Sequence, residues 1–293
     1  MPLRRLSFLP SFLSTPFLPK SMIRALFLSL PLFLTACHSS APSSSFRPNT
    51  LPGPEESPNI FKFYSAKEDA KPARGWVSSF DFSGVSFDSR KTATLVTPRH
   101  VVMAQHFKRK AGASVIFHDG EGKRLVRTLT KVRKVLGDVA VGELNTDVPS
   151  RFKVYRLPRP SRDESVLLNR LVAVTDQNRR VFFHRVRAIS GSGISFAYDK
   201  SEKHGWGKKL ISGDSGNPSF LIAGPELVLV ETHSTGGPGA GPFYGSPALQ
   251  QALQDTISMM TPGYRLRFDA RKARFAERAL ASPLPVEPKR EAR

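Results

Sequence analysis

Residues 213–218 read Gly-Asp-Ser-Gly-Asn-Pro, and Ser215 at their centre is the candidate nucleophile. A serine hydroxyl is a poor nucleophile at neutral pH, so it needs a base to accept its proton and donors to stabilise the oxyanion. Gly213 and Gly216 lack a Cβ, which lets the backbone turn sharply and aim the N–H groups of Gly213 and Ser215 at one point. The same composition also suits a polar turn between two strands, so the motif alone leaves both interpretations open.

The segment resembles the nucleophile motif Gly-Asp-Ser-Gly-Gly-Pro of the chymotrypsin-like (trypsin-fold) serine peptidases and departs from it once, at Asn217. The Gly-x-Ser-x-Gly elbow of α/β-hydrolases does not fit, because Asn217 occupies its last glycine position. The resemblance implies a serine endopeptidase that hydrolyses peptide bonds through an acyl-enzyme intermediate. It assigns the nucleophile to Ser215 and the oxyanion hole to the backbone N–H groups of Gly213 and Ser215.

A candidate base lies upstream, where residues 93–107 read Ala-Thr-Leu-Val-Thr-Pro-Arg-His-Val-Val-Met-Ala-Gln-His-Phe. This stretch is similar to the family's Gly-Thr-Leu-Ile-Ser-Pro-Arg-x-Val-Leu-Thr-Ala-Ala-His-Cys. Aligned residue by residue, the resemblance places the catalytic histidine at His106 and makes His100 the variable position after Pro-Arg. Phe107 replaces the family's cysteine, which is coherent in a chain whose single cysteine is Cys37.

The third member of the triad must accept the imidazole N–H and stabilise the imidazolium as it forms. Residues 138–144, Asp-Val-Ala-Val-Gly-Glu-Leu, resemble the family's Asp-Ile-Ala-Leu-Leu-x-Leu, which assigns this role to Asp138. Aspartate at the start of a strand is also a common turn residue. The chain order His106, Asp138, Ser215 is that of chymotrypsin, and it differs from the orders of subtilisin and the α/β-hydrolases.

The resemblance also assigns a substrate pocket to Lys209, Ser234 and Gly236. Lys209 stands six residues before the nucleophile, at the base of the family's primary specificity pocket, where a buried lysine would favour an acidic substrate side chain. The alternative is that residues 208–209 form a solvated turn. His233 is expected to be a neighbour of the site without a catalytic role.

Proteolytic activation is the feature of the family that the sequence does not reproduce. In many members a new N-terminus, freed by cleavage, pairs with the aspartate before the nucleophile. No Ile/Val-Val-Gly-Gly start precedes Trp76. Asp214 therefore needs another partner, or the oxyanion hole forms without activation.

Short segments of strand character recur along the chain, separated by Gly-rich turns such as residues 190–193, and helical stretches are few. Residues 76–87 alternate apolar and polar side chains over a long stretch, as a half-buried strand does. The other predicted strands are 93–96, 114–117, 125–132, 172–175, 181–189, 194–197, 220–223 and 227–232. This pattern predicts an all-β antiparallel sandwich or barrel.

The family resemblance covers residues 77–260 and implies two antiparallel six-stranded β-barrels of the chymotrypsin/trypsin fold. Residues 247–259 have helical spacing, and Ser246 precedes them as a plausible N-cap. A C-terminal helix at this place also suits the family. The peptidase domain is predicted over residues 61–262, with barrels at about 74–158 and 159–262, and a basic tail follows over residues 263–293.

The first 36 residues have the layout of a signal peptide. The apolar segment at residues 25–36 is too short to span a bilayer, and Met22 is an alternative start to Met1. Leu-Thr-Ala-Cys at residues 34–37 resembles a bacterial lipobox, which predicts a lipid on Cys37, membrane attachment and a Ser/Pro-rich tether over residues 37–60. Because His38 is not the aspartate associated with inner-membrane retention, an outer-membrane lipoprotein of the bacterial envelope is expected.

The formal net charge of +20 and a pI near 10.5 suit a nucleic-acid or anionic-membrane partner. The basic residues are scattered and carry no nucleic-acid recognition motif, so an anchored protein that faces anionic lipid explains them at least as well. We expect a protein or peptide substrate, no specific nucleic acid, and no cofactor or metal. Two alternatives stay open: a catalytically silent trypsin-fold lipoprotein that binds peptides or envelope components, and a basic lipoprotein that binds polyanions.

Overall fold

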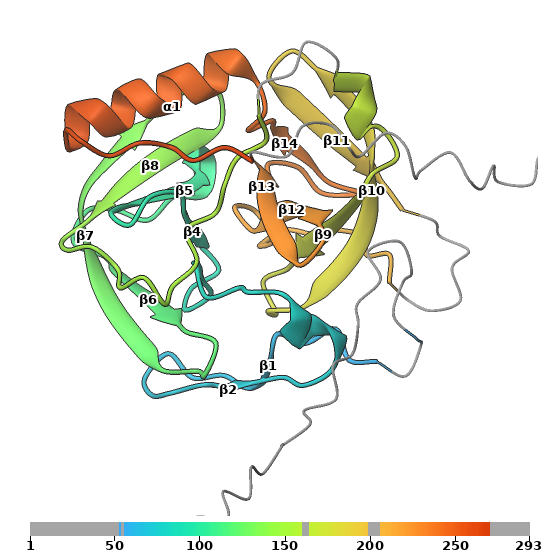
Figure 1. Cartoon of the computed structure of the whole chain (residues 1–293), viewed down its shortest axis with the longest axis horizontal. Helices are drawn as coiled ribbons and strands as arrows, with labels where there is room; N and C mark the ends of the chain where they lie inside the picture. The colour runs from blue at the N-terminus through green and yellow to red at the C-terminus, as the bar shows by residue number, and fades with distance from the viewer. Residues whose placement is uncertain (1–52, 54–55, 160–163, 199–205, 270–293) are drawn as a thin grey trace, which may run out of the picture. The chain divides into compact units, whose positions relative to one another are not determined.

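The computed structural model describes residues 53, 56–159, 164–198 and 206–269. Within these residues the chain forms two six-stranded antiparallel sheets, a small two-stranded sheet and one α-helix (Figure 1). The two-stranded sheet pairs β1 (Phe61–Phe63) with β2 (Lys71–Pro72). The expected all-β class, with two six-stranded antiparallel sheets and a C-terminal helix, is confirmed.

The first sheet has the strand order β3-β4-β5-β8-β7-β6. Its strands are β3 (Val85–Ser86), β4 (Ala93–Leu95), β5 (His100–Ala104), β6 (Ser114–His118), β7 (Arg124–Lys134) and β8 (Val139–Leu144). The end strands β3 and β6 contact each other, so the sheet curls almost into a barrel. Its interior is filled by apolar side chains that include Leu95, Met103, Phe117 and Leu144.

The second sheet has the order β13-β12-β9-β10-β11-β14. Its strands are β9 (Leu171–Thr175), β10 (Val181–Ser190), β11 (Gly193–Ala197), β12 (Pro218–Ala223), β13 (Glu226–Thr232) and β14 (Ala240–Pro242). Here the end strands β13 and β14 are in contact. When the strands of each sheet are numbered from one to six along the chain, both sheets have the same cyclic order, 1-2-3-6-5-4.

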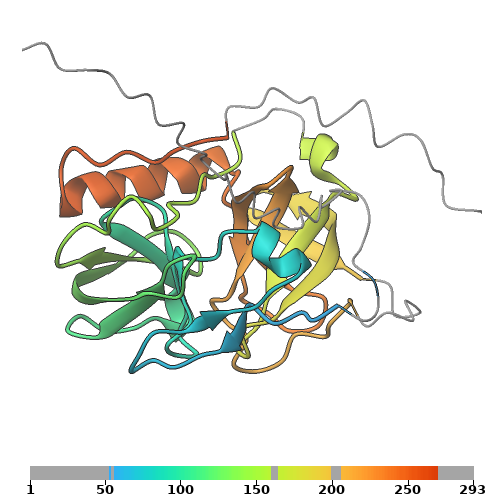
Figure 2. The same ribbon diagram turned by 60° about the horizontal axis from the view of Figure 1, so that its bottom comes forward.

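A further apolar cluster, separate from the interior of the first sheet, joins the two sheets and the helix into one core. It contains Val102 and Val141 from the first sheet, Phe220 and Leu229 from the second, and Leu253 from the helix. The helix α1 (Pro247–Met260) runs beside β8 (Figures 1 and 2). This shared core fixes the first sheet against the second, which matters because the candidate site draws residues from both.

The predicted strands from residue 93 onward are confirmed to within two residues at each end. The strand predicted over residues 76–87 is wrong: Trp76–Ser79 form a 3₁₀ helix, η1, and only Val85–Ser86 pair in a sheet. The apolar side chains of this stretch, such as Val77 and Phe82, are nevertheless buried. Ser83 and Ser86 are buried as well, so the alternation predicted the burial of the apolar side chains but neither the burial of these serines nor the backbone conformation.

The folded body extends beyond both predicted boundaries of the peptidase domain. At the N-terminal side, Ile60 is buried and its N–H donates to Arg179, so the last residues of the expected tether belong to the fold. At the C-terminal side, Leu266 is buried and the N–H of Leu157 donates to the carbonyl of Arg267. The first residues of the expected tail therefore pack against the segment that connects the two sheets.

The predicted signal peptide, Cys37 and most of the expected tether and tail lie outside the described residues. Among the helices of the described part, none has both the length and the apolar character that a membrane crossing would require. Ser246 occupies the N-cap position of α1, as expected, but its side chain makes no capping hydrogen bond; Pro247 begins the helix instead.

Candidate active site

His106, Asp138 and Ser215 meet where the two sheets adjoin. His106 lies in the 3₁₀ turn η2 (Gln105–Phe107) directly after β5, and Asp138 lies in the turn between β7 and β8. Ser215 comes from the second sheet, in the turn that leads into β12. The ring Nδ1 of His106 is 2.7 Å from Asp138 Oδ2, and its Nε2 is 3.0 Å from Ser215 Oγ. The structure thus places the three predicted residues in one hydrogen-bonded chain.

Asp138 fixes both the position and the tautomer of His106. The backbone N–H of His106 donates to Asp138 Oδ1 at 2.8 Å, and the ring Nδ1 faces Oδ2. Because a carboxylate only accepts hydrogen bonds, Nδ1 carries the proton and Nε2 is left to accept the Ser215 hydroxyl. The exposed fraction of the His106 side chain is 46%, so Nε2 is also open to a reactant.

Ser234 adds a third donor to Asp138, with its Oγ 2.5 Å from Oδ2. Burial by itself would raise the pKa of the Asp138 carboxyl, but the hydrogen bonds from Ser234 and from the backbone and ring of His106 outweigh it and lower that pKa below its ordinary value. Asp138 is therefore a carboxylate at neutral pH. Such a group can stabilise an imidazolium on His106 without taking its proton.

The loop before Ser215 presents two unused backbone donors. Gly213 has a φ of 96°, a conformation that strongly favours glycine. In the described part of the chain, the N–H groups of Gly213 and Ser215 donate to no protein acceptor. The neighbouring carbonyl of Ser212 is held by Gln177 Nε2 at 3.2 Å. Free donors beside a serine hydroxyl are the arrangement that an oxyanion requires.

Asn217, the single departure from the family's motif, is completely buried and its side-chain amide is paired. Its Nδ2 donates to the carbonyl of Asp214 at 3.0 Å, and its Oδ1 accepts from Thr92 Oγ1 at 3.1 Å. Thr92 precedes β4 of the first sheet. The asparagine therefore ties the nucleophile loop to the other sheet, which a glycine at this position could not do with a side chain.

Asp214 is buried beside the nucleophile and is paired with Lys208. Its Oδ2 accepts from Lys208 Nζ at 3.3 Å and from the N–H of Ile211 at 2.9 Å, and its Oδ1 accepts from the N–H of Gln177 at 3.1 Å. Lys208 Nζ also lies 2.5 Å from Asp176 Oδ2. Breaking a buried pair of this kind generally costs about 3–5 kcal/mol, because the remaining charge is left without a partner.

The Lys208 network was not predicted from the sequence. Asp176 and Gln177 belong to a polar turn between two predicted strands, and that turn was the only sequence signal at this place. Lys208 carries no motif signal of its own, because its contacts depend on how distant segments fold together. His184 supports the same segment: burial lowers its pKa to about 4, so its neutral Nε2 accepts the Lys208 N–H.

The three predicted pocket residues are in different surroundings. Ser234 hydrogen-bonds to Asp138, as described above, and Gly236 lies against the carbonyl of Leu210, where an added Cβ would be 3.0 Å from that oxygen. Lys209 is exposed, which fits the alternative of a solvated position; the neighbouring Lys208 is the one whose ammonium group points inward, toward Asp176 and Asp214.

The backbone next to Lys209 and the backbone next to Gly236, two of the predicted pocket residues, are hydrogen-bonded to each other. The N–H of Leu210 donates to the carbonyl of Gly237 at 2.7 Å, and the N–H of Gly237 donates back to Leu210 at 3.0 Å. The Leu210 side chain is buried in the interior of the second sheet, in the cluster that contains Phe196 and Val230. Strands paired in this way lie about 5.5 Å apart, which leaves no room for a side chain between them.

His233 and Glu231 form a second buried pair behind the site. The exposed fraction of each is at most 1%, and His233 Nδ1 lies 2.8 Å from Glu231 Oε2, while its Nε2 lies 3.1 Å from the Thr175 carbonyl. Both ring nitrogens thus face acceptors. Burial alone would lower the pKa of His233, but the carboxylate of Glu231 outweighs it and raises that pKa above 6.5. Among the described residues, the ring of His233 contacts these two acceptors and not Ser215.

His100 lies away from the triad, inside the first sheet. Its Nδ1 contacts Thr97 Oγ1 at 2.9 Å, and its ring packs edge-on against Tyr264. Burial lowers the pKa of His100 to about 4, which leaves the ring neutral at physiological pH. Of the two candidate histidines, His106 is the one that contacts Ser215.

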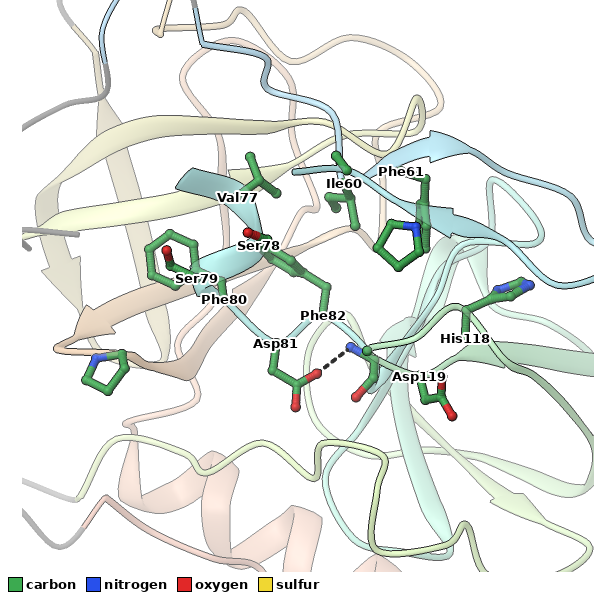
Figure 3. Close-up of a pocket in the computed structure, with 15 residues that line it drawn as sticks. Ile60, Phe61, Val77, Ser78, Ser79, Phe80, Asp81, Phe82, His118 and Asp119 are labelled. Atoms are coloured by element: carbon green, nitrogen blue, oxygen red, sulfur yellow. Dashed lines mark hydrogen bonds between the residues drawn. The ribbon is translucent and has the colours of Figure 1, made fainter. Parts of the chain in front are cut away.

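Hollows lie both beside the triad and away from it. One, of about 230 Å³, is bounded by Asp138, Ser234 and Leu249 among others, and so adjoins the triad. The other, of about 240 Å³, is lined by Ile60, Phe82 and His118, and by none of the triad residues (Figure 3). In it, Asp81 accepts a hydrogen bond from the Ser83 N–H within its own turn. This second hollow shows no reactive arrangement.

Among the described residues, no group of histidine, cysteine, aspartate or glutamate side chains is arranged to hold a metal ion. No protein-family model matches the sequence, and a search of curated proteins finds no significant relative. The function is therefore inferred from the geometry of the site.

The Glu231–His233 pair predicts a pH dependence of stability. Because the folded-state pKa of His233 is raised, the pair contributes fully below the unfolded pKa of about 6.5, and its contribution is lost as pH rises through the folded value. An NMR titration should show His233 still protonated above pH 6.5, while His184 titrates near 4 as an internal reference. In Glu231→Gln the His233 pKa should fall. A His233 ring that is already neutral at pH 6.5 in the wild type would contradict the assignment.

Proposed function

We propose that this protein is a serine endopeptidase of the trypsin-like type, in which Ser215 attacks the scissile carbonyl. The observation that carries the proposal is the continuous hydrogen-bonded chain from Asp138 through His106 to the Ser215 hydroxyl. Two curled antiparallel sheets with the same cyclic strand order are compatible with the double-barrel fold of that family. The site at their junction is where such a triad would be assembled.

In the proposed mechanism His106 Nε2 accepts the proton of Ser215 as its Oγ attacks the carbonyl carbon. Asp138 stabilises the imidazolium that results, and the N–H groups of Gly213 and Ser215 stabilise the oxyanion. His106 then gives its proton to the leaving amine, which leaves an acyl group on Ser215. Water, with its proton taken by His106, hydrolyses this ester and regenerates the serine.

A fluorophosphonate probe tests the proposal directly, because it reacts with activated serines. The wild-type chain should be labelled, and Ser215→Ala and His106→Ala should not. Asp138→Asn should lower kcat on a peptide substrate by about 10⁴-fold, because the amide N–H can donate to the imidazole and favour the wrong tautomer. The matched histidine control, His100→Gln, should keep its labelling if circular dichroism shows it to be folded. A folded wild type that takes no label would favour the catalytically silent binding protein.

The hydrogen-bonded bridge between Leu210 and Gly237 supports a preference for small residues at the scissile position. In a peptide series that varies only this residue, we expect Gly and Ala to give kcat/KM values at least about tenfold above those of Phe, Lys and Glu. The reason is that a paired backbone bridge leaves no slot for a larger side chain. A clear preference for Glu would restore the pocket role of Lys209, and a preference for Phe would show that the bridge opens when substrate binds.

We also propose that the protein is a lipoprotein of the bacterial envelope, anchored through a lipid on Cys37, and that its location is the outer membrane. The support is the lipobox-like sequence at residues 34–37 and the +20 formal charge, which suits an anionic surface. In a bacterial host fed an alkyne fatty acid, the full chain should take the label and sediment with outer membranes. Cys37→Ser should lose both properties, and Ser39→Ala should keep them. An unlabelled wild type would contradict the anchor.

A further inference from the structure

Asp214 is a buried carboxylate next to the nucleophile, and it needs a positively charged partner. The exposed fraction of its side chain is 1%, and it follows Gly213, the proposed oxyanion donor, directly in the sequence. A carboxylate removed from water at this place needs a cation and hydrogen-bond donors to remain charged. The side-chain partners of Asp214 therefore fix the loop that carries the Gly213 N–H, because Asp214 directly follows Gly213 in that loop.

Lys208 supplies the cation from within the same chain. Its side chain is 15% exposed and its Nζ contacts the carboxylates of both Asp214 and Asp176, which are 1% and 0% exposed. The second negative charge is balanced by Arg180, whose guanidinium lies 2.8 Å from Asp176. Lys208 Nζ also lies over the ring of Phe182, 5.3 Å from its centroid. The ammonium group is therefore held on several sides.

The same network sets the direction of the peptide bond that carries the oxyanion donor. Asp214 holds the N–H of Ile211 and that of Gln177, and the Gln177 side chain holds the carbonyl of Ser212. The N–H of Gly213 belongs to the Ser212–Gly213 peptide, so it points opposite to that carbonyl. Rotating this peptide would break the Gln177 hydrogen bond. The charged network and Gln177 together keep the donor available.

We propose that Lys208 is a positioning residue that replaces the cleavage-generated N-terminus, so that the oxyanion hole is formed in the uncut chain. The inference rests on the proposed peptidase function and adds its regulation: no proteolytic activation is required. A side-chain ammonium is present as soon as the chain folds, whereas a terminal ammonium appears only after cleavage. The unused N–H groups of Gly213 and Ser215 agree with a hole that is already formed.

The test uses the full chain and its Lys208→Met and Lys208→Arg variants, with Lys67→Met as the control at an exposed lysine outside the site. Probe labelling rate and the separate kcat and KM values for a peptide substrate are measured, and mass spectrometry of the labelled species defines its N-terminus. The wild type should react while its chain still begins before residue 57. Lys208→Met should lose at least about 100-fold in kcat with a much smaller change in KM, the effect of losing an oxyanion donor. Lys208→Arg should recover part of that loss.

Because Lys208→Met leaves the buried carboxylate of Asp214 without its cation, the double variant Lys208→Met/Asp214→Asn is measured beside it. It removes one charge of each sign, so it should fold where the single variant does not, and it should still be slow. A folded Lys208→Met or double variant with wild-type kcat would overturn the inference while leaving the peptidase function intact. Labelling that appears only after the chain is cut would do the same. A folded wild type that takes no label, whether or not the chain has been cut, would instead overturn the proposed function.

Discussion

The hydrogen bond between His106 and Ser215 crosses from one sheet to the other, and the rest of the site depends on that crossing. A separation of 3.0 Å between Nε2 and Oγ is preserved only if the two sheets cannot shift against each other. The shared apolar core and the helix α1 provide that constraint. Close to the site, the Asn217 side chain adds a polar tie to Thr92, and the N–H of Gly216 donates to His233 behind the loop.

The chain has a single cysteine, Cys37, which lies outside the described residues. Buried ion pairs hold the nucleophile loop in place: Asp176, Lys208 and Asp214 join the β9–β10 turn to the residues before Ser215. A second pair, Glu231 and His233, lies behind it. Buried pairs of this sort add little net stability compared with apolar packing, but they strongly penalise arrangements that separate the partners. They therefore suit a loop whose conformation has to be unique.

Sequence patterns predicted the fold where local signals and burial agree. The strands from β6 to β13 have turn residues at both ends. All of them except β8 were predicted from that pattern. The central strands β5 and β8 were not predicted as strands, although they are as completely buried as β4, which was predicted. Residues 76–87 show the opposite failure, since a stretch that alternates in polarity contains a 3₁₀ turn and only two residues that pair in a sheet.

At the site, the motif windows predicted which residues come together, because His106, Asp138 and Ser215 each lie beside a strand whose register is set by burial. The sequence could not decide which of the two adjacent lysines is directed inward: it is Lys208, while Lys209 is exposed. That choice is made by Asp176 and His184, which are distant in sequence, and no local period reports it. The pairing of Leu210 with Gly237 was not predicted for a related reason, since it is a tertiary contact.

The arrangement around Asp138 bears on whether the site is catalytic or silent. Asp138 lies in a turn with a side chain that is 25% exposed, so water could satisfy its oxygens without any help from the protein. It nevertheless receives the His106 N–H, the His106 ring and the Ser234 hydroxyl. Folding alone does not require three donors on a carboxylate that solvent can reach. A reaction in which positive charge develops on the adjacent imidazole does require a carboxylate that stays ionised and fixed, and these donors lower its pKa and hold it in place.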